Sequence, residues 1–98
     1  METFNDIISG EVLTLVDFYA TWCGPCKTMH PILEQVKEKL GDKIRIIKID
    51  VDKHQELSLK YNIQAVPTFM LFRKGEMLHR FSGGMGRVDL VYLLEQYL

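Results

Sequence analysis

The apolar run VLTLVDFYA, residues 12–20, constrains the fold most, because β-branched and aromatic side chains fall on both of its faces. This pattern is typical of a strand that is buried from two sides, as in a sheet with helices on both faces. One acid, Asp17, interrupts the run, and the only two cysteines of the chain, Cys23 and Cys26, follow closely after it. The sequence therefore predicts a buried strand that leads directly into a CxxC motif.

Hydrophobic periodicity and turn residues predict the other elements. Helices are expected at 2–9, 23–40, 56–63 and 89–98, and strands at 43–51, 68–72 and 76–81. Lys74-Gly75 is expected to form a tight hairpin turn between the last two strands. Strands that alternate with helices favour parallel pairing, whereas the final hairpin must be antiparallel. The sequence thus predicts one α/β domain over residues 1–98, with a small mixed sheet covered by helices on both faces.

Composition and charge exclude several kinds of partner. The chain has 98 residues, is 47% hydrophobic and has a formal net charge of −1, with its Lys and Arg residues dispersed along the chain. This balance does not favour binding to nucleic acid or to an acidic membrane. No run approaches the roughly 20 apolar residues that span a bilayer, and the first residues lack the pattern of a signal peptide. We therefore expect a cytoplasmic monomer.

A CxxC motif has three ordinary interpretations: part of a zinc site, a static disulfide, or a redox pair. A structural zinc site needs four ligands, but the histidines His30, His54 and His79 are scattered, so we expect no metal. A static disulfide across so short a loop would constrain the unfolded chain little. The redox interpretation agrees best with a strand that runs directly into the motif.

The position of the motif at a helix start favours this chemistry. A thiolate at Cys23 would meet free backbone N–H groups and the positive end of the helix dipole, which lower the pKa of a cysteine. Gly24 gives the turn its freedom, and Pro25 fits the first helical turn. Cys26 lies one turn inward, so it is expected to be the shielded thiol.

The sequence WCGPCK, preceded by VDF and followed by Val66-Pro67-Thr68 and by Gly83, resembles the thioredoxin family over nearly the whole chain. The resemblance implies the thioredoxin fold and a protein-disulfide reductase. It implies that Cys23 attacks the substrate disulfide and that Cys26 resolves the mixed disulfide. It also assigns Asp17 as the buried acid behind Cys26, with Lys48 as its partner on the neighbouring strand.

The resemblance further implies a substrate groove and an electron source. Pro67 would be a cis-proline facing the motif, and the backbone of Val66 would bind the substrate as a short strand. Trp22 and Gly83 would rim the groove, together with Gly24 and Pro25 of the motif. No cofactor would be bound, because electrons would come from NADPH through a flavoprotein thioredoxin reductase. The expected partners are that reductase and disulfide-containing client proteins.

The residues themselves support a special role for Asp17. A carboxylate among Leu15, Val16 and Phe18 is costly to charge, so it holds a proton more strongly and can act as a base toward Cys26. His30 lies one helical turn beyond Cys26 on the same side. It is expected either to couple to Asp17 or to turn outward at Pro31 and meet only solvent.

Three departures from the family pattern affect the expected structure. The N-terminal strand that usual members carry is expected to be missing or vestigial, which leaves about four strands and makes 43–51 an edge. Tyr19 stands where many relatives have Trp, and His30 stands where small residues are common. Two other functions stay open, namely a redox-inert scaffold that only binds partners and an oxidase or isomerase of an exported compartment.

Overall fold

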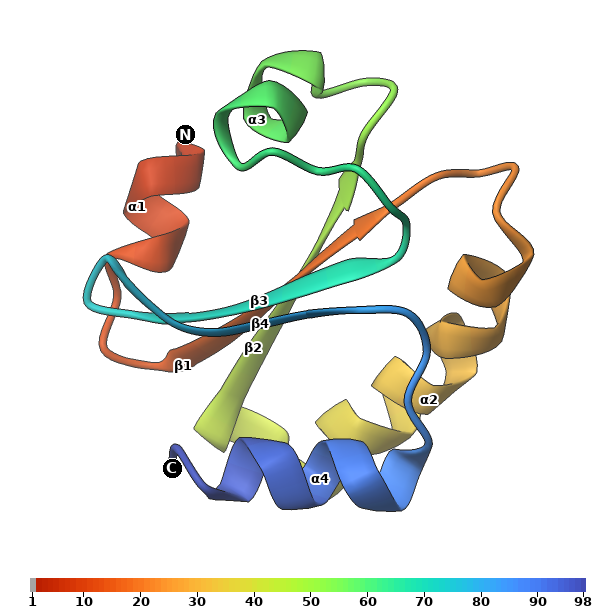
Figure 1. The fold of residues 1–98 in the computed structure, drawn as a ribbon. Helices are drawn as coiled ribbons and strands as arrows, with labels where there is room; N and C mark the ends of the chain where they lie inside the picture. Colours follow the sequence, from red (N-terminus) through yellow and green to blue (C-terminus); the bar gives the residue numbers. More distant parts are fainter. Residues whose placement is uncertain (1) are drawn as a thin grey trace.

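A computed structural model describes residues 2–98 as a single sheet between two layers of helices (Figure 1). The strands are β1 (Leu13–Tyr19), β2 (Ile44–Asp50), β3 (Thr68–Arg73) and β4 (Glu76–Ser82). The helices are α1 (Phe4–Ile8), α2 (Gly24–Leu40), α3 (Gln55–Lys60) and α4 (Arg87–Glu95), with a short 3-10 turn at Gly41–Lys43.

The sheet has the strand order β2-β1-β3-β4, so the strand with apolar residues on both faces is an inner one. β1 pairs with β2 in parallel and with β3 antiparallel, and β3 pairs with β4 antiparallel. β1 is buried on both faces from Leu13 to Phe18. The predicted mixed sheet of four strands is therefore confirmed.

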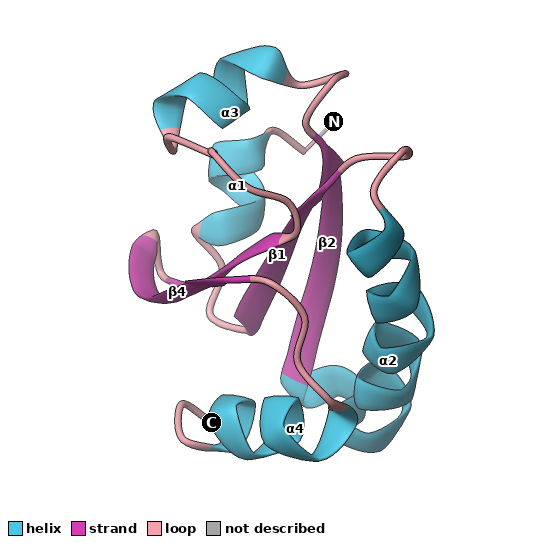
Figure 2. Ribbon diagram, turned by 45° about the vertical axis from the view of Figure 1, so that its right-hand side comes forward, coloured by secondary structure: helices cyan, strands magenta, loops and turns pink. Residues whose placement is uncertain are grey.

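Each face of the sheet packs against its own pair of helices (Figure 2). Leu13 and Leu15 of β1 point toward α2 and α4, where they pack with Met29, Leu33 and Leu94. The alternate β1 residues point to the other face. There Val16, Phe18, Ile49, Met70 and Phe72 form the core with Ile8 of α1, and Tyr61 packs against it after α3. Because side chains alternate along a strand, Asp17 lies on the same face as Leu15, toward α2.

Local chemistry explains several element boundaries. Thr3 caps α1 through a reciprocal capping box with Asp6, so this helix begins at Phe4 and not at residue 2. At the hairpin, Lys74 and Gly75 have φ values of 53° and 80°, the left-handed pair that a two-residue turn with the right twist requires. α4 begins two residues earlier than predicted, at Arg87, with Gly86 as its N-cap.

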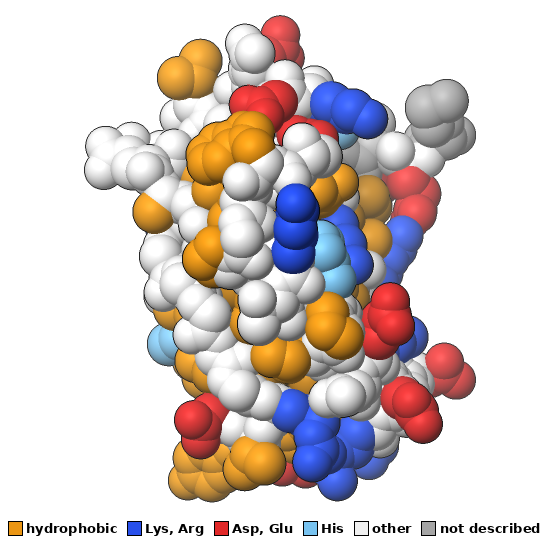
Figure 3. Space-filling model, turned by 90° about the vertical axis from the view of Figure 1, so that its right-hand side faces the viewer, with side chains coloured by type: hydrophobic (Ala, Val, Ile, Leu, Met, Phe, Trp, Pro, Cys, Tyr) orange, Lys and Arg blue, Asp and Glu red, His pale blue; other side chains and the backbone are white. Residues whose placement is uncertain are grey.

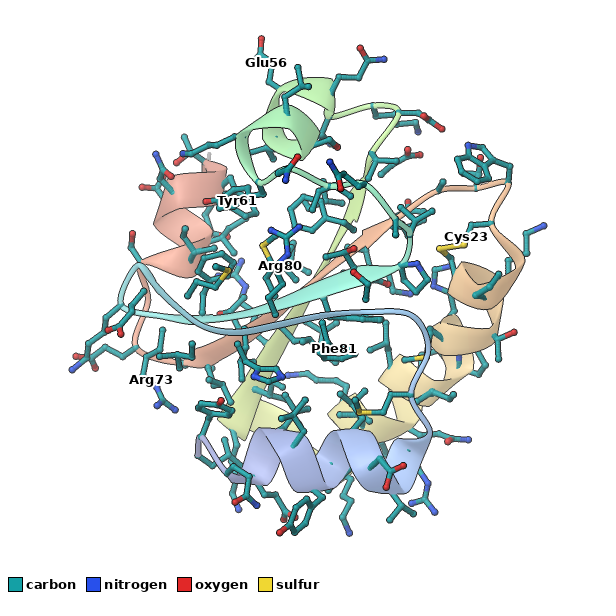
Figure 4. The ribbon with its side chains drawn as sticks, in the orientation of Figure 1. Cys23, Glu56, Tyr61, Arg73, Arg80 and Phe81 are labelled. Carbon is teal, nitrogen blue, oxygen red and sulfur yellow. A yellow bond between two sulfur atoms is a disulfide. The ribbon has the colours of Figure 1, made fainter. Side chains whose placement is uncertain are left out.

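Two arginines, which Figure 4 labels, connect distant elements by donating hydrogen bonds to backbone carbonyls. Arg80 of β4 donates to the carbonyls of Tyr61 and Asn62, at 2.6 and 3.0 Å, and so fixes the end of α3. Arg73 of β3 donates to the carbonyl of Tyr97 at 2.6 Å, which ties down the end of the chain after α4. Within residues 2–98, no helix combines the length and the apolar character that crossing a membrane requires.

The predicted edge strand is also observed. β2 pairs only with β1 in the described part of the chain, and no strand precedes α1 within residues 2–98. Charged side chains occupy this edge: Arg45 forms a bidentate ion pair with Glu2, and Lys48 is exposed. Such charges discourage pairing with other chains.

Candidate active site

The two cysteines lie where β1 passes into α2. After Tyr19 the chain turns through Ala20, and Cys23 becomes the N-cap of α2, with extended backbone angles (φ −92°, ψ 116°). The backbone N–H of Cys26 donates to Cys23 Sγ over 3.1 Å. This geometry offers a Cys23 thiolate a hydrogen-bond donor and the positive end of the helix dipole.

Cys23 and Cys26 are joined by a disulfide, with 5.3 Å between their Cα atoms. Cys23 is 4% exposed and Cys26 is completely buried, so an approaching thiol or disulfide reaches Cys23 first. Cys23 lies near the start of α2 (Figure 4). The predicted shielding of Cys26 is confirmed.

A loop before β3 faces the disulfide. The Val66–Pro67 peptide bond is cis, as the family resemblance implies. The carbonyl oxygen of Val66 lies 3.6 Å from Cys23 Sγ, so backbone that could pair with an extended chain borders the reactive sulfur. Gly83 closes this loop, because its N–H donates to the carbonyl of Pro67 at 2.9 Å while its φ of 90° favours glycine.

Asp17 lies on the face of β1 that is directed toward α2, and it is completely buried. Neither of its carboxylate oxygens has a hydrogen-bond partner among the described residues. Burial raises the pKa of Asp17 to about 6, and the positive charge of Lys48 opposes this increase. A carboxylate with such a pKa can accept a proton close to neutral pH, as a general base must.

Lys48 is the neighbour of Asp17 on β2, and its side chain extends toward the solvent. The backbone register sets Lys48 directly opposite Asp17, as predicted, but its side chain is exposed and not buried inward. Its Nζ atom lies 2.9 Å from His30 Nδ1. The Lys48 side chain is exposed because β2 is an edge strand. At an edge, a long side chain can reach water while its stem covers the sheet. The catalytic role of Lys48 stays a prediction.

His30 is half-buried beside the site. Its ring meets the ring of Tyr19 edge-on, at 5.6 Å between centroids and 80° between planes. Partial burial, and then the neighbouring Lys48 ammonium, hold the pKa of His30 below its ordinary value of 6.5, against the opposite effect of Glu34. His30 has therefore not turned outward into solvent alone, although α2 continues through Pro31.

Trp22 forms an exposed wall next to the cysteines. It is 69% exposed, and its indole N–H donates to Asp52 Oδ2 at 3.0 Å. Sequence reasoning missed Asp52, although a signal was present. β1 and β2 are parallel, so the residues after their carboxyl ends meet at one edge of the sheet. Asp52 thereby holds the indole in place as a contact surface.

Two hollows flank the motif. One has a volume of about 420 Å³ and is lined by Trp22, Val51, Ile63, Gln64, Ala65 and Val66. The other has a volume of about 460 Å³ and is lined by Pro25, Thr28, Met29, Ile32, Gly84, Met85 and Gly86. Figure 3 shows the face of the molecule that is on the right in Figure 1, where α2 lies. This face carries apolar side chains interspersed with Lys, Arg and His. The site thus combines a buried disulfide with apolar surfaces on both sides.

Comparison with known proteins supports this assignment of the site. The family model described as Thioredoxin matches residues 1–96. "Thioredoxin Y, chloroplastic" of Oryza sativa subsp. japonica is 46% identical over 97 residues, which cover 98% of this chain and 58% of that protein. "Thioredoxin" of Bacillus subtilis (strain 168) is 39% identical over 90 residues, 92% of this chain and 86% of that protein.

A solved structure shows the same likeness. The thioredoxin of Plasmodium falciparum matches with a TM-score of 0.86 and 38% sequence identity, over 97% of this chain and 91% of that chain. In contrast, the chain spans only 57–58% of the length of chloroplastic relatives that it matches, among them the rice protein.

Proposed function

The chain belongs to the thioredoxin family, and on this premise we propose that it reduces protein disulfides through the Cys23–Cys26 pair. The observation that carries the proposal is the disulfide itself. It lies at the β1–α2 junction, beside the Val66 carbonyl. It is also on the face of the sheet that holds Asp17, whose carboxylate has no hydrogen-bond partner among residues 2–98. A structural zinc site or a purely structural disulfide would need neither the Val66 backbone beside Cys23 nor the buried acid Asp17.

The first step is attack on the client. The Cys23 thiolate attacks one sulfur of the client disulfide, a Cys23–client disulfide forms, and the other client sulfur leaves as a thiolate that is protonated by water. The backbone of Val66 and the cis-Pro67 loop hold the client chain next to Cys23 as a short strand. Trp22 and the loop at Gly83 border the client on either side.

The second step releases the client. Asp17 takes the proton of the Cys26 thiol, and the resulting thiolate attacks Cys23 Sγ. The Cys23–Cys26 disulfide forms as the bond to the client breaks, and the second client sulfur leaves. Two electrons have then passed from the dithiol to the client, so the protein must be reduced before it reacts again.

The electron donor is proposed from the family. NADPH would reduce a flavoprotein thioredoxin reductase, which would reduce the Cys23–Cys26 disulfide. The protein itself needs no bound cofactor, because thiol–disulfide exchange uses only its two sulfur atoms. The cytoplasmic location and the monomeric state stay predictions, and the rice relative is named chloroplastic.

A turnover assay tests the proposed activity. With a small dithiol as the electron donor, the protein is expected to accelerate the reduction of a protein disulfide, such as that of insulin. The matched control carries serine at both Cys23 and Cys26, and it is expected to give only the rate of the dithiol alone. Equal acceleration by this control would refute the assignment of the cysteine pair.

A second assay tests the contact surface. Trp22→Ala is expected to lower the rate of reduction of a protein disulfide about tenfold, because a large exposed aromatic side chain is lost from the client interface. Reduction of glutathione disulfide, which is too small to need that surface, should change little. Tyr92→Ala is the matched control, since Tyr92 is similarly exposed, at 68%, but lies on α4. Equal losses for both clients would exclude a role of Trp22 in client contact.

A further inference from the structure

A lysine of β2 and a histidine of α2 are in contact on the face of the sheet toward which Asp17 is directed. Lys48 Nζ lies 2.9 Å from His30 Nδ1. An ammonium group can only donate hydrogen bonds, so His30 Nδ1 must be the acceptor and its proton must reside on Nε2. The contact therefore requires a neutral imidazole.

Three elements fix this contact in space. Lys48 lies opposite Asp17 in the register of β1 and β2. Tyr19, two residues after Asp17 on the same face of β1, holds the His30 ring edge-on at 5.6 Å. His30 lies one turn after the buried Cys26 on α2. The contact thus joins β2 to α2 on the face of the sheet toward which Asp17 is directed.

Within residues 2–98, few charged groups act on Asp17 and His30. α2 contributes Glu34, besides His30 itself, and β2 contributes Lys48. Tyr19 comes from β1 itself, and the β3 residue that pairs with Asp17 is the apolar Phe69. The position of the Lys48 ammonium is therefore the main variable in the electrostatic environment of Asp17.

We propose that His30 is a positioning residue that anchors the Lys48 ammonium beside Asp17 and thereby limits the proton affinity of this carboxylate. The inference rests on the proposed function, in which Asp17 accepts the proton of Cys26. Without an acceptor, an exposed lysine moves freely into water, where its charge is hydrated and screened. With the imidazole as an anchor, the ammonium stays near a carboxylate that lacks any hydrogen-bond partner among residues 2–98.

The charges of the site agree with this role. The Lys48 charge opposes the increase that burial causes in the pKa of Asp17. Burial, and then Lys48, also keep the pKa of His30 below its ordinary value, so the imidazole is neutral and can accept a hydrogen bond at neutral pH. If Lys48 were free, burial alone would dominate, and Asp17 would hold its proton to a higher pH.

The test follows the Asp17 carboxyl carbon by NMR titration in the disulfide form of the protein, in which neither cysteine titrates. His30→Leu keeps the bulk of the side chain but removes the acceptor, and it is expected to raise the pKa of Asp17 by about one unit. His30→Asn keeps an acceptor near the position of Nδ1 and should restore a titration close to that of the unmodified protein. In a Lys48→Met background, His30→Leu should cause no further shift.

Two results would overturn the proposal. One is an unchanged or lowered pKa of Asp17 in His30→Leu. The other is a shift that persists fully in the Lys48→Met background, because His30 would then act on Asp17 without the lysine. Since this titration needs neither client nor reductase, its outcome is independent of whether the protein reduces disulfides. In an active protein, the rate of resolution should fall at low pH as Asp17 becomes protonated. The midpoint of this fall should shift with the pKa of Asp17 in His30→Leu, and it should return to its original value in His30→Asn.

Discussion

Cys26→Ser is expected to trap client proteins as stable mixed disulfides, whereas Cys23→Ser should trap none. Cys23 is the more exposed sulfur and caps α2, where a backbone N–H stabilises its thiolate. Without Cys26 the mixed disulfide cannot be resolved within the protein, so turnover should fall to the level of the dithiol alone. Mass spectrometry of a mixture with a client disulfide, quenched by alkylation, measures the trapped species.

The pair of serine variants is its own control, because both remove one thiol and leave the other. If Cys23→Ser traps the client as strongly as Cys26→Ser, the assignment of attacking and resolving cysteine is wrong. If neither variant traps it, the client does not react through a mixed disulfide at this site.

Asp17→Asn is expected to stabilise the protein and to slow resolution. The pKa of Asp17 rises from its ordinary value of 3.8 to about 6 because of burial, and Lys48 only partly opposes this. At about 1.36 kcal/mol per pKa unit, charging Asp17 in the folded protein costs roughly 3 kcal/mol. A neutral amide avoids this cost but keeps a buried polar group without a partner, so a gain of about 2 kcal/mol in the free energy of unfolding is expected.

The raised pKa of Asp17 makes the stability of the unmodified protein depend on pH. The folded protein holds the Asp17 proton more strongly than the unfolded chain, so the unmodified protein loses stability as the pH rises from about 4 to about 6. The advantage of Asp17→Asn should therefore vanish near pH 4 and be complete above about pH 6. Denaturant unfolding at several pH values measures it.

Asp50→Asn is the matched control for stability. Asp50 is also a buried acid of the sheet, but its Oδ1 accepts a hydrogen bond from the backbone N–H of Asp52 at 2.9 Å. Its substitution should bring no gain. A loss of stability in Asp17→Asn at neutral pH would mean that Asp17 serves as a structural partner of Lys48.

Asp17→Asn also tests the proposed role of Asp17 as the general base for Cys26. Removal of a positioned general base typically costs a factor of about 100 or more, so resolution of the mixed disulfide should slow by at least that factor while attack by Cys23 continues. Stopped-flow measurement of the two client thiols separates the steps. Equal rates of resolution in Asp17→Asn and the unmodified protein would remove Asp17 from the mechanism.

Much of the fold follows from patterns that one sequence contains. The apolar residues on both faces of 12–20 predicted a strand buried from two sides, and β1 is buried on both faces from Leu13 to Phe18. Lys74-Gly75 predicted the hairpin because a two-residue turn needs positive φ values. The first residues of α1 and α4 differ from the predicted ones by two. Thr3 and Gly86 are the N-caps of these helices, and hydrophobic periodicity does not show where a cap lies.

The parts of the site that follow from the order of strand, CxxC motif and helix along the chain were predictable. A strand that runs into a CxxC helix places Cys23 at the helix start and Cys26 inside it, and both positions are observed. Contacts between side chains of different elements were not predictable in this way. The reach of Lys48 to His30 and the bond from Trp22 to Asp52 depend on rotamers and on the relative placement of strands and helices.

The central claim is that two electrons leave the protein through Cys23 and Cys26 together, and a single-turnover stoichiometry tests it most directly. Fully reduced protein is mixed with an equimolar protein disulfide without oxygen, the thiols are alkylated, and mass spectrometry locates every disulfide. We expect each opened client disulfide to be matched by one new Cys23–Cys26 disulfide within the same chain. Opened client disulfides accompanied by alkylated Cys23 and Cys26, which had therefore stayed reduced, would contradict the account.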